Sequence, residues 1–145
     1  GNVGDVRHWL GQGADVNGMS PGGWTALVYA ADRSRAEVID VLLQANADPN
    51  IAEKDGWSPL MFSAVKGDHN HQAVEWLLSI GADPNLAEKD GWTPLFFAVF
   101  SGDVELCRPI LEAGSDLRHR LPSGKSVLDL ARERNAPAVV ELLVQ

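Results

Sequence analysis

The sequence has a single cysteine, Cys107, among its 145 residues. One cysteine excludes an internal disulfide framework and a cysteine-rich zinc site within one chain, and it fits an intracellular, cytoplasmic or nuclear location. Long hydrophobic runs are also missing: the longest, Pro94 to Phe100, has seven residues, whereas a membrane span needs about 20. The N-terminus lacks a basic stretch followed by an apolar one, so no secretory signal is visible.

Basic residues are scarce, because 12 Lys and Arg face 20 Asp and Glu, for a formal net charge of −8. An acidic chain is repelled by nucleic acid duplexes and by anionic membranes, so we expect neither as a partner. The hydrophobic fraction of 45% and the charged fraction of 22% are globular values. A chain of this length and composition should fold as one domain.

What the sequence does contain is an internal repeat. Residues 52–57 and 87–92 both read Ala-Glu-Lys-Asp-Gly-Trp. The hydroxyl residue that follows recurs, with spacings of 33, 35 and 33, at Thr25, Ser58, Thr93 and Ser126. A second landmark, Gly or Asn followed by a small residue and Asp, keeps the same spacings in residues 13–17, 46–50, 81–85 and 114–118. Two landmarks with one period indicate a solenoid of repeated units.

Each repeat predicts a helix, a turn, a second helix and a loop. The recurring Thr or Ser is an N-cap, whose hydroxyl accepts a hydrogen bond from a free N–H group of the first helix. Pro59 and Pro94 then occupy the first helical position, where no donor is lost. Residues that tolerate a positive φ end the second helices, namely Gly13, Asn46, Gly81 and Gly114.

A unit with Thr/Ser-Pro-Leu at its start and Gly-Ala-Asp-x-Asn at its end resembles the ankyrin repeat, and the resemblance covers the whole chain. It implies an all-α ankyrin-repeat solenoid, a curved array of antiparallel helix pairs with hairpin loops, as a single domain over residues 1–145. Residues 1–17 match the second half of a truncated repeat, which suggests a monomeric module of a longer chain. Three repeats follow at 20–50, 53–85 and 88–118, and residues 121–145 form a C-terminal capping repeat.

The sequence departs from the family pattern in two ways. The repeat at 53–85 has a two-residue insertion near His69 and Asn70, most simply a longer turn. Family repeats usually place a His after Pro-Leu, and we expect apolar packing to replace it, since those positions are Val28, Met61, Phe96 and Asp129. The duplicated hexapeptide also suits an engineered, consensus-like array, whereas the irregular segments 68–71 and 118–122 favour a natural origin.

The resemblance places a binding surface in the concave groove formed by the loop tips and the first helices. The partner-binding positions that it implies here are Trp24, Arg33, Lys54, Asp55, Trp57, Val65, Lys66, Lys89, Asp90, Trp92, Phe100 and Lys125. The charged groove residues also include Asp32, Arg120, Glu133 and Arg134, which makes seven basic against four acidic, a local balance of +3. We therefore expect an acidic-hydrophobic or phosphorylated partner.

Several hypotheses about function stay open at this point. The main one is a non-enzymatic protein–protein interaction module or scaffold that binds a partner protein or extended peptide in the groove. The alternative is recognition of a phosphorylated or nucleotide-like small ligand, with a Trp stacking on a base and Lys54, Lys66 or Lys89 meeting phosphates. A cage for methylated lysine needs acidic surroundings, which the charge balance argues against. The recurring Trp24, Trp57 and Trp92 are either anchors for a partner or structural residues that pack over the next hairpin.

Catalytic, cofactor and metal sites are not expected. The segment Asp68-His69-Asn70-His71 supplies no fixed metal geometry, and Gly124-Lys125-Ser126 lacks the earlier Gly of a phosphate-binding loop. Cys107 falls on the apolar side of a second helix, where a buried structural thiol is expected. The resemblance also marks candidate hydroxylation positions at Asn17, Asn50 and Asn85.

Overall fold

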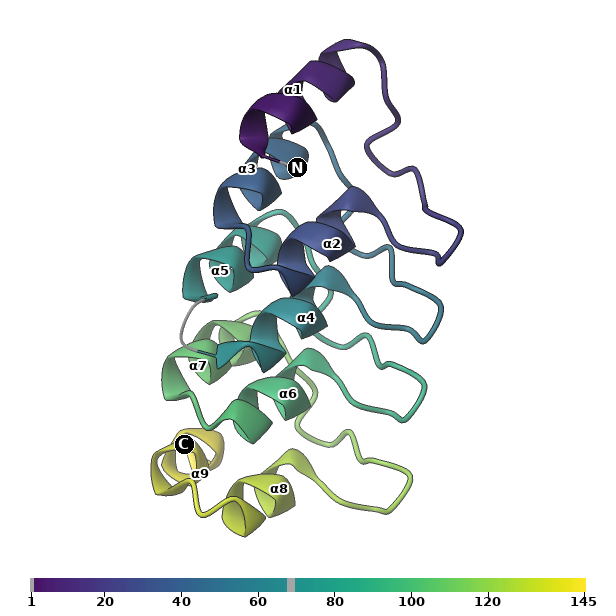
Figure 1. Cartoon of the computed structure of the whole chain (residues 1–145). Coiled ribbons are helices and arrows are strands. Elements are labelled where there is room, and N and C mark those ends of the chain that lie inside the picture. Colours follow the sequence, from purple (N-terminus) through teal and green to yellow (C-terminus); the bar gives the residue numbers. More distant parts are fainter. Residues whose placement is uncertain (1, 68–69) are drawn as a thin grey trace.

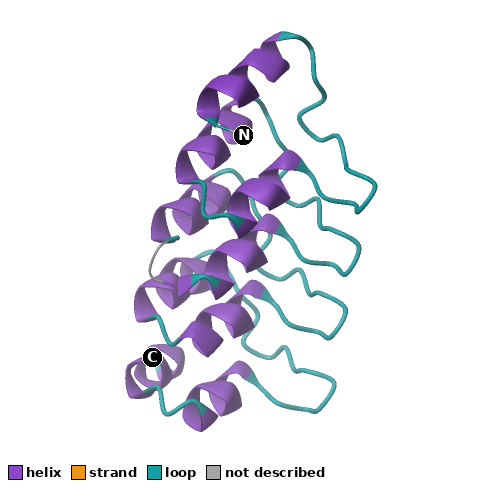
Figure 2. Cartoon of the chain, viewed as in Figure 1, coloured by secondary structure: helices purple, strands orange, loops and turns teal. Residues whose placement is uncertain are grey.

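The computed structural model describes residues 2–67 and 70–145, and within these ranges it contains nine helices and no extended strand. The helices are α1 (Val3–Gly11), α2 (Ala26–Asp32), α3 (Ala36–Gln44), α4 (Pro59–Val65), α5 (His71–Ser79), α6 (Pro94–Ser101), α7 (Val104–Glu112), α8 (Val127–Glu133) and α9 (Pro137–Val144). Figures 1 and 2 show them as a stack with long loops on one side. The predicted all-α solenoid is confirmed.

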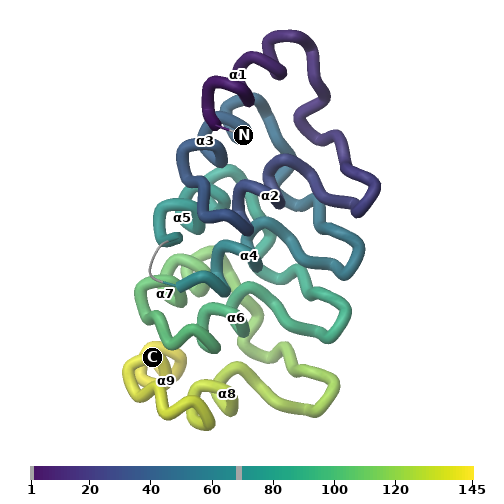
Figure 3. Tube along the Cα trace, in the orientation of Figure 1, coloured from purple at the N-terminus to yellow at the C-terminus, as the bar shows by residue number. Residues whose placement is uncertain are grey.

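The stack has two layers of helices. The even-numbered helices α2, α4, α6 and α8 contact one another in series, and so do the odd-numbered helices α1, α3, α5, α7 and α9. The two helices of one repeat also pack together, as α4 does with α5 and α6 with α7. Figure 3 shows the loops stacked one over another beside the even-numbered helices, with the two ends of the chain at opposite ends of the stack.

The even-numbered helices begin at the predicted N-cap residues. The hydroxyls of Thr25, Ser58 and Ser126 accept hydrogen bonds from backbone N–H groups three residues on, at 3.2, 3.4 and 3.1 Å. Ser126 and Asp129 complete a capping box. Thr93 is also an N-cap residue, but its hydroxyl accepts no cap hydrogen bond within the described ranges, so this part of the prediction is wrong. Pro94, whose ring fixes φ near the helical value, starts α6 instead.

The odd-numbered helices α1, α3, α5 and α7 end where positive φ was predicted. Gly13, Gly81 and Gly114 have φ values of +86°, +97° and +96°, and Asn46 has +62°. Each of these residues donates its backbone N–H to a carbonyl of the last helical turn, at 3.0 to 3.1 Å. These C-caps turn the chain out of the helix layer and into the next loop.

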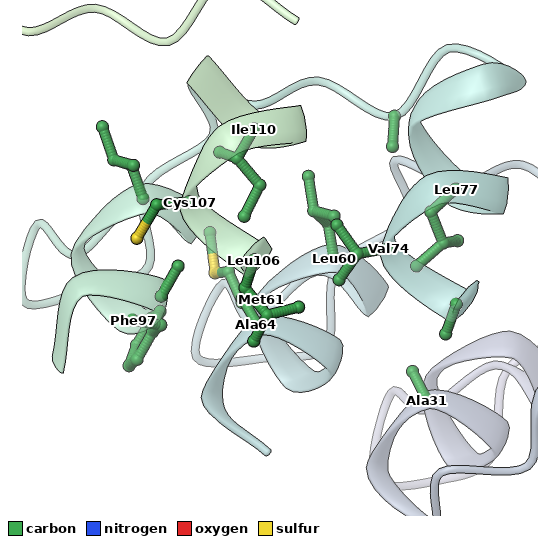
Figure 4. Packing of buried hydrophobic residues seen from close by; sticks show 14 of the residues in the cluster. Ala31, Leu60, Met61, Ala64, Val74, Leu77, Phe97, Leu106, Cys107 and Ile110 are labelled. Carbon is green, nitrogen blue, oxygen red and sulfur yellow. The ribbon is translucent and has the colours of Figure 1, made fainter. Parts of the chain in front are cut away.

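The core lies between the two layers and runs along the whole stack. Figure 4 shows Leu60 and Met61 of α4 facing side chains of α5 and α7. At the positions where the family usually has His, Val28 and Met61 are fully buried and Phe96 is 1% exposed. Apolar packing therefore replaces the His network in these three repeats, as predicted. In the last repeat Asp129 is used for the capping box.

The predicted longer turn falls between α4 and α5. Five residues separate Val65 from His71, whereas three separate Asp32 from Ala36. Residues 68 and 69, on which the predicted insertion partly falls, lie outside the described residues. His71 at the start of α5 contacts the next repeat, because its Nε2 lies 2.7 Å from Oδ2 of Asp103, the N-cap of α7.

Candidate functional site

Each predicted groove tryptophan ends a hairpin, just before the N-cap of an even-numbered helix. Glu53 donates its N–H to the Trp57 carbonyl and Glu88 donates its N–H to the Trp92 carbonyl, both at 3.0 Å. The two glutamate side chains return the contact, because their Oε1 atoms accept the N–H groups of Trp57 at 3.0 Å and Trp92 at 2.9 Å. Both glutamates belong to the duplicated hexapeptide, which therefore positions these two tryptophans.

The groove tryptophans join a continuous row of rings that crosses the repeats. Trp24 lies 5.1 Å from Phe62, and Trp57 lies 5.0 Å from the same ring and 4.4 Å from Phe97, measured between ring centroids. Trp92 lies 5.1 Å from Phe97. The row extends to Tyr29 at one end and Phe100 at the other. We call these seven rings the aromatic row: Trp24, Tyr29, Trp57, Phe62, Trp92, Phe97 and Phe100.

The groove tryptophans pack against aromatic side chains within their own repeat, and two of them also pack against a ring in the next one. Trp24 and Trp57 each contact a ring of their own repeat and a ring of the next, at distances typical of favourable aromatic pairs. All three groove tryptophans are only half-buried. They therefore hold neighbouring repeats together and still present part of each ring to the groove.

A pocket of about 350 Å³ opens between the second and third groove tryptophans. Its lining is mainly apolar and consists of Trp57, Val65, Glu88, Asp90, Trp92, Phe97 and Phe100. Five of these seven are predicted binding positions. Phe97 and Glu88 were not among them, because their sequence positions suggest a packed helix face and a hairpin residue. An aromatic residue stands five positions after each groove tryptophan, as Phe62 does after Trp57 and Phe97 after Trp92, and this spacing is the signal that could have indicated the aromatic row.

Ion pairs occupy many of the basic side chains of the groove. Lys66 Nζ and Arg33 Nε approach Asp32 at 3.5 and 3.4 Å, and Lys89 Nζ lies 3.1 Å from Asp55 Oδ1. The Asp55 hydrogen bond and charge raise the pKa of Lys89. In the last repeat Lys125 contacts Glu133 at 2.6 Å.

Two basic residues of the groove have no carboxylate partner among residues 2–67 and 70–145. One is Lys54, which is exposed on the second hairpin. The other is Arg134, whose guanidinium carbon lies 4.2 Å from the centroid of the Phe100 ring. Three further carboxylates stand at hairpins and at a helix start, namely Glu53, Glu88 and Asp129. When these three are counted, the seven basic groove residues face seven acidic ones, and the local balance is 0 in place of the +3 of the smaller set.

The family follows from comparison with known proteins. A family model for ankyrin repeats, which represents three copies, matches residues 1–88 and again residues 63–145. The two matches together cover the whole chain. The chain belongs to the ankyrin repeat family. Ankyrin repeats generally mediate protein–protein interaction, and the family is typically non-enzymatic.

The ankyrin repeats of this chain are similar to parts of much longer proteins. Protein phosphatase 1 regulatory subunit 12A of Mus musculus is 45% identical over 65 residues, which is 43% of this chain and 6% of that protein. The mitochondrial disaggregase of Bos taurus is 48% identical over 52 residues, 36% of this chain and 8% of that protein. The 2-5A-dependent ribonuclease of Homo sapiens is 38% identical over 63 residues, 43% of this chain and 8% of that protein. The chain thus spans under a tenth of these relatives.

The asparagines at the candidate hydroxylation positions form hydrogen bonds between neighbouring ankyrin repeats. The side-chain oxygens of Asn17, Asn50 and Asn85 accept the N–H groups of Asp48, Asp83 and Asp116 at 2.8, 2.7 and 2.7 Å. Asn50 and Asn85 also donate to the carbonyls of Gly81 and Gly114 at 3.1 and 3.0 Å. Whether these asparagines are modified stays a prediction, while their hydrogen bonds give them a structural role.

Other sequence features take structural places in the ankyrin stack. Gly124, at φ +84°, and Ser126 form the turn and cap of the last hairpin. Cys107 is fully buried, and burial with the nearby Asp103 charge raises the pKa of its thiol to about 12.

Within the described ranges no three His, Cys, Asp or Glu side chains gather as a metal site, and none of the helices is long and apolar enough to cross a membrane. Of the segment considered as a metal site, residues 68 and 69 lie outside those ranges.

Proposed function

We propose that this chain is a non-enzymatic binding module that holds a partner protein or an extended peptide in its groove, along the tryptophans and lysines of the hairpins. The observation that carries the proposal is the aromatic row together with its pocket. Ring contacts between repeats hold the exposed ring surfaces in place before a partner arrives. A preformed surface loses little conformational entropy on binding, which favours affinity.

The partner we propose is acidic-hydrophobic or phosphorylated. Large aromatic side chains supply most of the binding energy in many interfaces, which suits apolar anchors on the partner. Lys54 is exposed and has no ion pair in the described part of the chain, so its ammonium group can meet a carboxylate or phosphate of the partner. The relative named as a phosphatase regulatory subunit is consistent with a role in binding another protein.

A comparative pull-down from cell lysate tests the proposal. Phe100→Ala is the better groove variant, because Phe100 is 42% exposed, whereas the three groove tryptophans also hold repeats together. The control is Trp9→Ala on α1, where Trp9 is 62% exposed and lies outside the aromatic row. We expect Phe100→Ala with Lys54→Ala to reduce capture of the specific partners about tenfold or more and Trp9→Ala to leave it unchanged. Equal capture by the groove variant and the wild type would contradict the proposal.

The second candidate function is binding of a nucleotide-like or phosphorylated small ligand in the same groove. It is favoured by the stretch of similarity to a ribonuclease whose name describes it as 2-5A-dependent, and by ring faces on which a base could stack. Two of the three lysines considered for phosphate contact, Lys66 and Lys89, already pair with carboxylates, which weakens this candidate. A thermal-shift screen of nucleotides tests it, and an unchanged melting temperature across the panel would exclude it.

A further inference from the structure

The pocket between Trp57 and Trp92 differs in charge from the rest of the groove. Its only charged lining residues are Glu88 and Asp90, and no Lys or Arg is among the residues that line it. Lys89 stands between them in sequence. Its ammonium group pairs with Asp55 of the preceding hairpin at 3.1 Å, and the charges of Asp90 and Glu88 act on it more weakly than that of Asp55. The pocket therefore combines aromatic walls with two negative groups.

The hairpin holds the carboxylate of Glu88 in place, whereas the side chain of Asp90 is exposed at the mouth of the pocket. Glu88 is only 6% exposed, and its Oε1 accepts the N–H groups of Asp90 at 3.0 Å and Trp92 at 2.9 Å. Within residues 2–67 and 70–145 no donor contacts its Oε2, and the Asp90 side chain forms no ion pair. A buried or half-enclosed carboxylate that loses its water is costly unless a donor replaces that water. A purely apolar occupant would leave this cost uncompensated.

The molecule already places a cation on one of the pocket's rings. The Arg134 guanidinium lies over Phe100, with its central carbon 4.2 Å from the ring centroid. Guanidinium groups favour such positions because the face of an aromatic ring is negative and because the planar group stacks on it. Phe100 is therefore a ring whose face binds a guanidinium within this chain.

We propose that the pocket receives an arginine side chain of the partner. The aliphatic part of the arginine packs on Val65 and the rings, and its guanidinium stacks on the exposed faces of Trp57 or Trp92. Its N–H groups donate to the carboxylates of Glu88 and Asp90, which a compact ammonium group cannot do with the same planar geometry. The inference rests on the proposed function and sharpens it: the partner segment carries one arginine among acidic residues, and one of those acidic residues meets Lys54, whose side chain lies beside Gly23 of the first hairpin.

Small probes test the pocket directly. The intact 145-residue chain is titrated with N-acetyl-arginine amide at constant ionic strength, and the indole N–H signals of its five tryptophans are followed by NMR. We expect saturable shifts of the Trp57 and Trp92 signals, in the millimolar range of a single side chain, and unchanged signals of Trp9. The matched probe is N-acetyl-citrulline amide, which has nearly the same shape and no charge. Equal shifts with citrulline, or none with arginine, would overturn the proposal, as would tighter binding of a trimethyllysine analogue.

A charge-removing variant completes the test. Asp90→Asn keeps the shape of the side chain, and we expect about threefold weaker binding of the arginine probe. The control is Glu112→Gln, on the exposed side of α7, which should bind as the wild type does. Unchanged binding by Asp90→Asn would contradict the role given to the carboxylates.

The two proposals fail in different ways. If the groove variant loses its partners but arginine does not bind, the arginine site alone is wrong. If arginine binds but the groove variant captures the same partners as the wild type, the proposed function alone is wrong.

Discussion

At the scale of single residues, the repeat pattern predicts which side chains lie at equivalent positions. The contacts that each of them makes depend on the residues around it. The sequence pattern predicted Trp57, Val65, Asp90, Trp92 and Phe100 as groove residues, and the structure brings all five to one pocket. Their use by a partner stays a proposal. The pattern missed Phe97 because the spacing along one chain does not say how far one repeat lies from the next. It missed Glu88 because the sequence does not distinguish it from an ordinary hairpin residue.

The thiol of Cys107 has a consequence for stability at alkaline pH. Its pKa is about 12 in the folded chain against an ordinary value of 9.0, so between these values the unfolded chain has lost a proton that the folded chain keeps. The thiol's contribution to the free energy of unfolding is fully present below the ordinary pKa. Between the ordinary and the raised pKa it falls by about 1.4 kcal/mol per pH unit.

Replacing the thiol should therefore flatten the alkaline side of the stability profile. We expect Cys107→Ala to lower stability at pH 7, through lost packing in the core, yet to lose less additional stability than the wild type between pH 9 and pH 11. Urea unfolding at each pH measures both. Parallel profiles for the two chains would show that the thiol does not stay protonated in the fold.

At the scale of elements, helix ends were the most predictable features, because caps depend on residues close in sequence. Gly13, Gly81, Gly114 and Asn46 have the positive φ predicted for them. Thr93 shows the limit of this kind of argument, since the same residue type at the same place in the repeat makes no cap hydrogen bond.

The caps of α6 and α8 should respond differently to loss of their hydroxyls. Ser126→Ala removes the capping box of α8 and should destabilise the chain by about 1 kcal/mol. Thr93→Val keeps the shape of a side chain whose hydroxyl accepts no cap bond, so we expect a change of under about 0.5 kcal/mol. Denaturant unfolding measures both, and a larger cost for Thr93→Val than for Ser126→Ala would contradict the assignment.

The capping box also depends on pH in a predictable direction. The hydrogen bonds from the backbone and side chain of Ser126 lower the pKa of Asp129. Its contribution is therefore present above the ordinary Asp pKa and is lost as the pH falls through the lowered value. The difference between wild type and Ser126→Ala should shrink in acid.

At the scale of the whole molecule, the stack is a one-dimensional array in which each repeat is stabilised mainly by its neighbours. The first helix, α1, has no buried residue, and its main contacts are with α3. Helices in the middle of the stack contact neighbours on both sides, as α4 does with α2 and α6. Local stability should therefore vary along the chain.

Hydrogen exchange should show this gradient directly. We expect backbone amides of α1 to exchange at least about tenfold faster than those of α4 to α7, because α1 contributes only partly buried side chains to the core. Exchange measured by mass spectrometry or NMR provides the comparison. Equal protection of α1 and α6 would mean that the stack opens as one unit.

The aromatic row distinguishes two kinds of evolutionary substitution in the groove: those of the ring residues and those of the hairpin-tip residues. Replacing a ring such as Trp57 alters the fit between repeats as well as the groove, so selection for stability resists it. The hairpin-tip residues Lys54, Asp55, Lys89 and Asp90 lie beside the rings without forming the row, and they can change with little effect on folding. New binding specificities are therefore expected to arise at the tips while the rings persist, so relatives with different partners should differ there first.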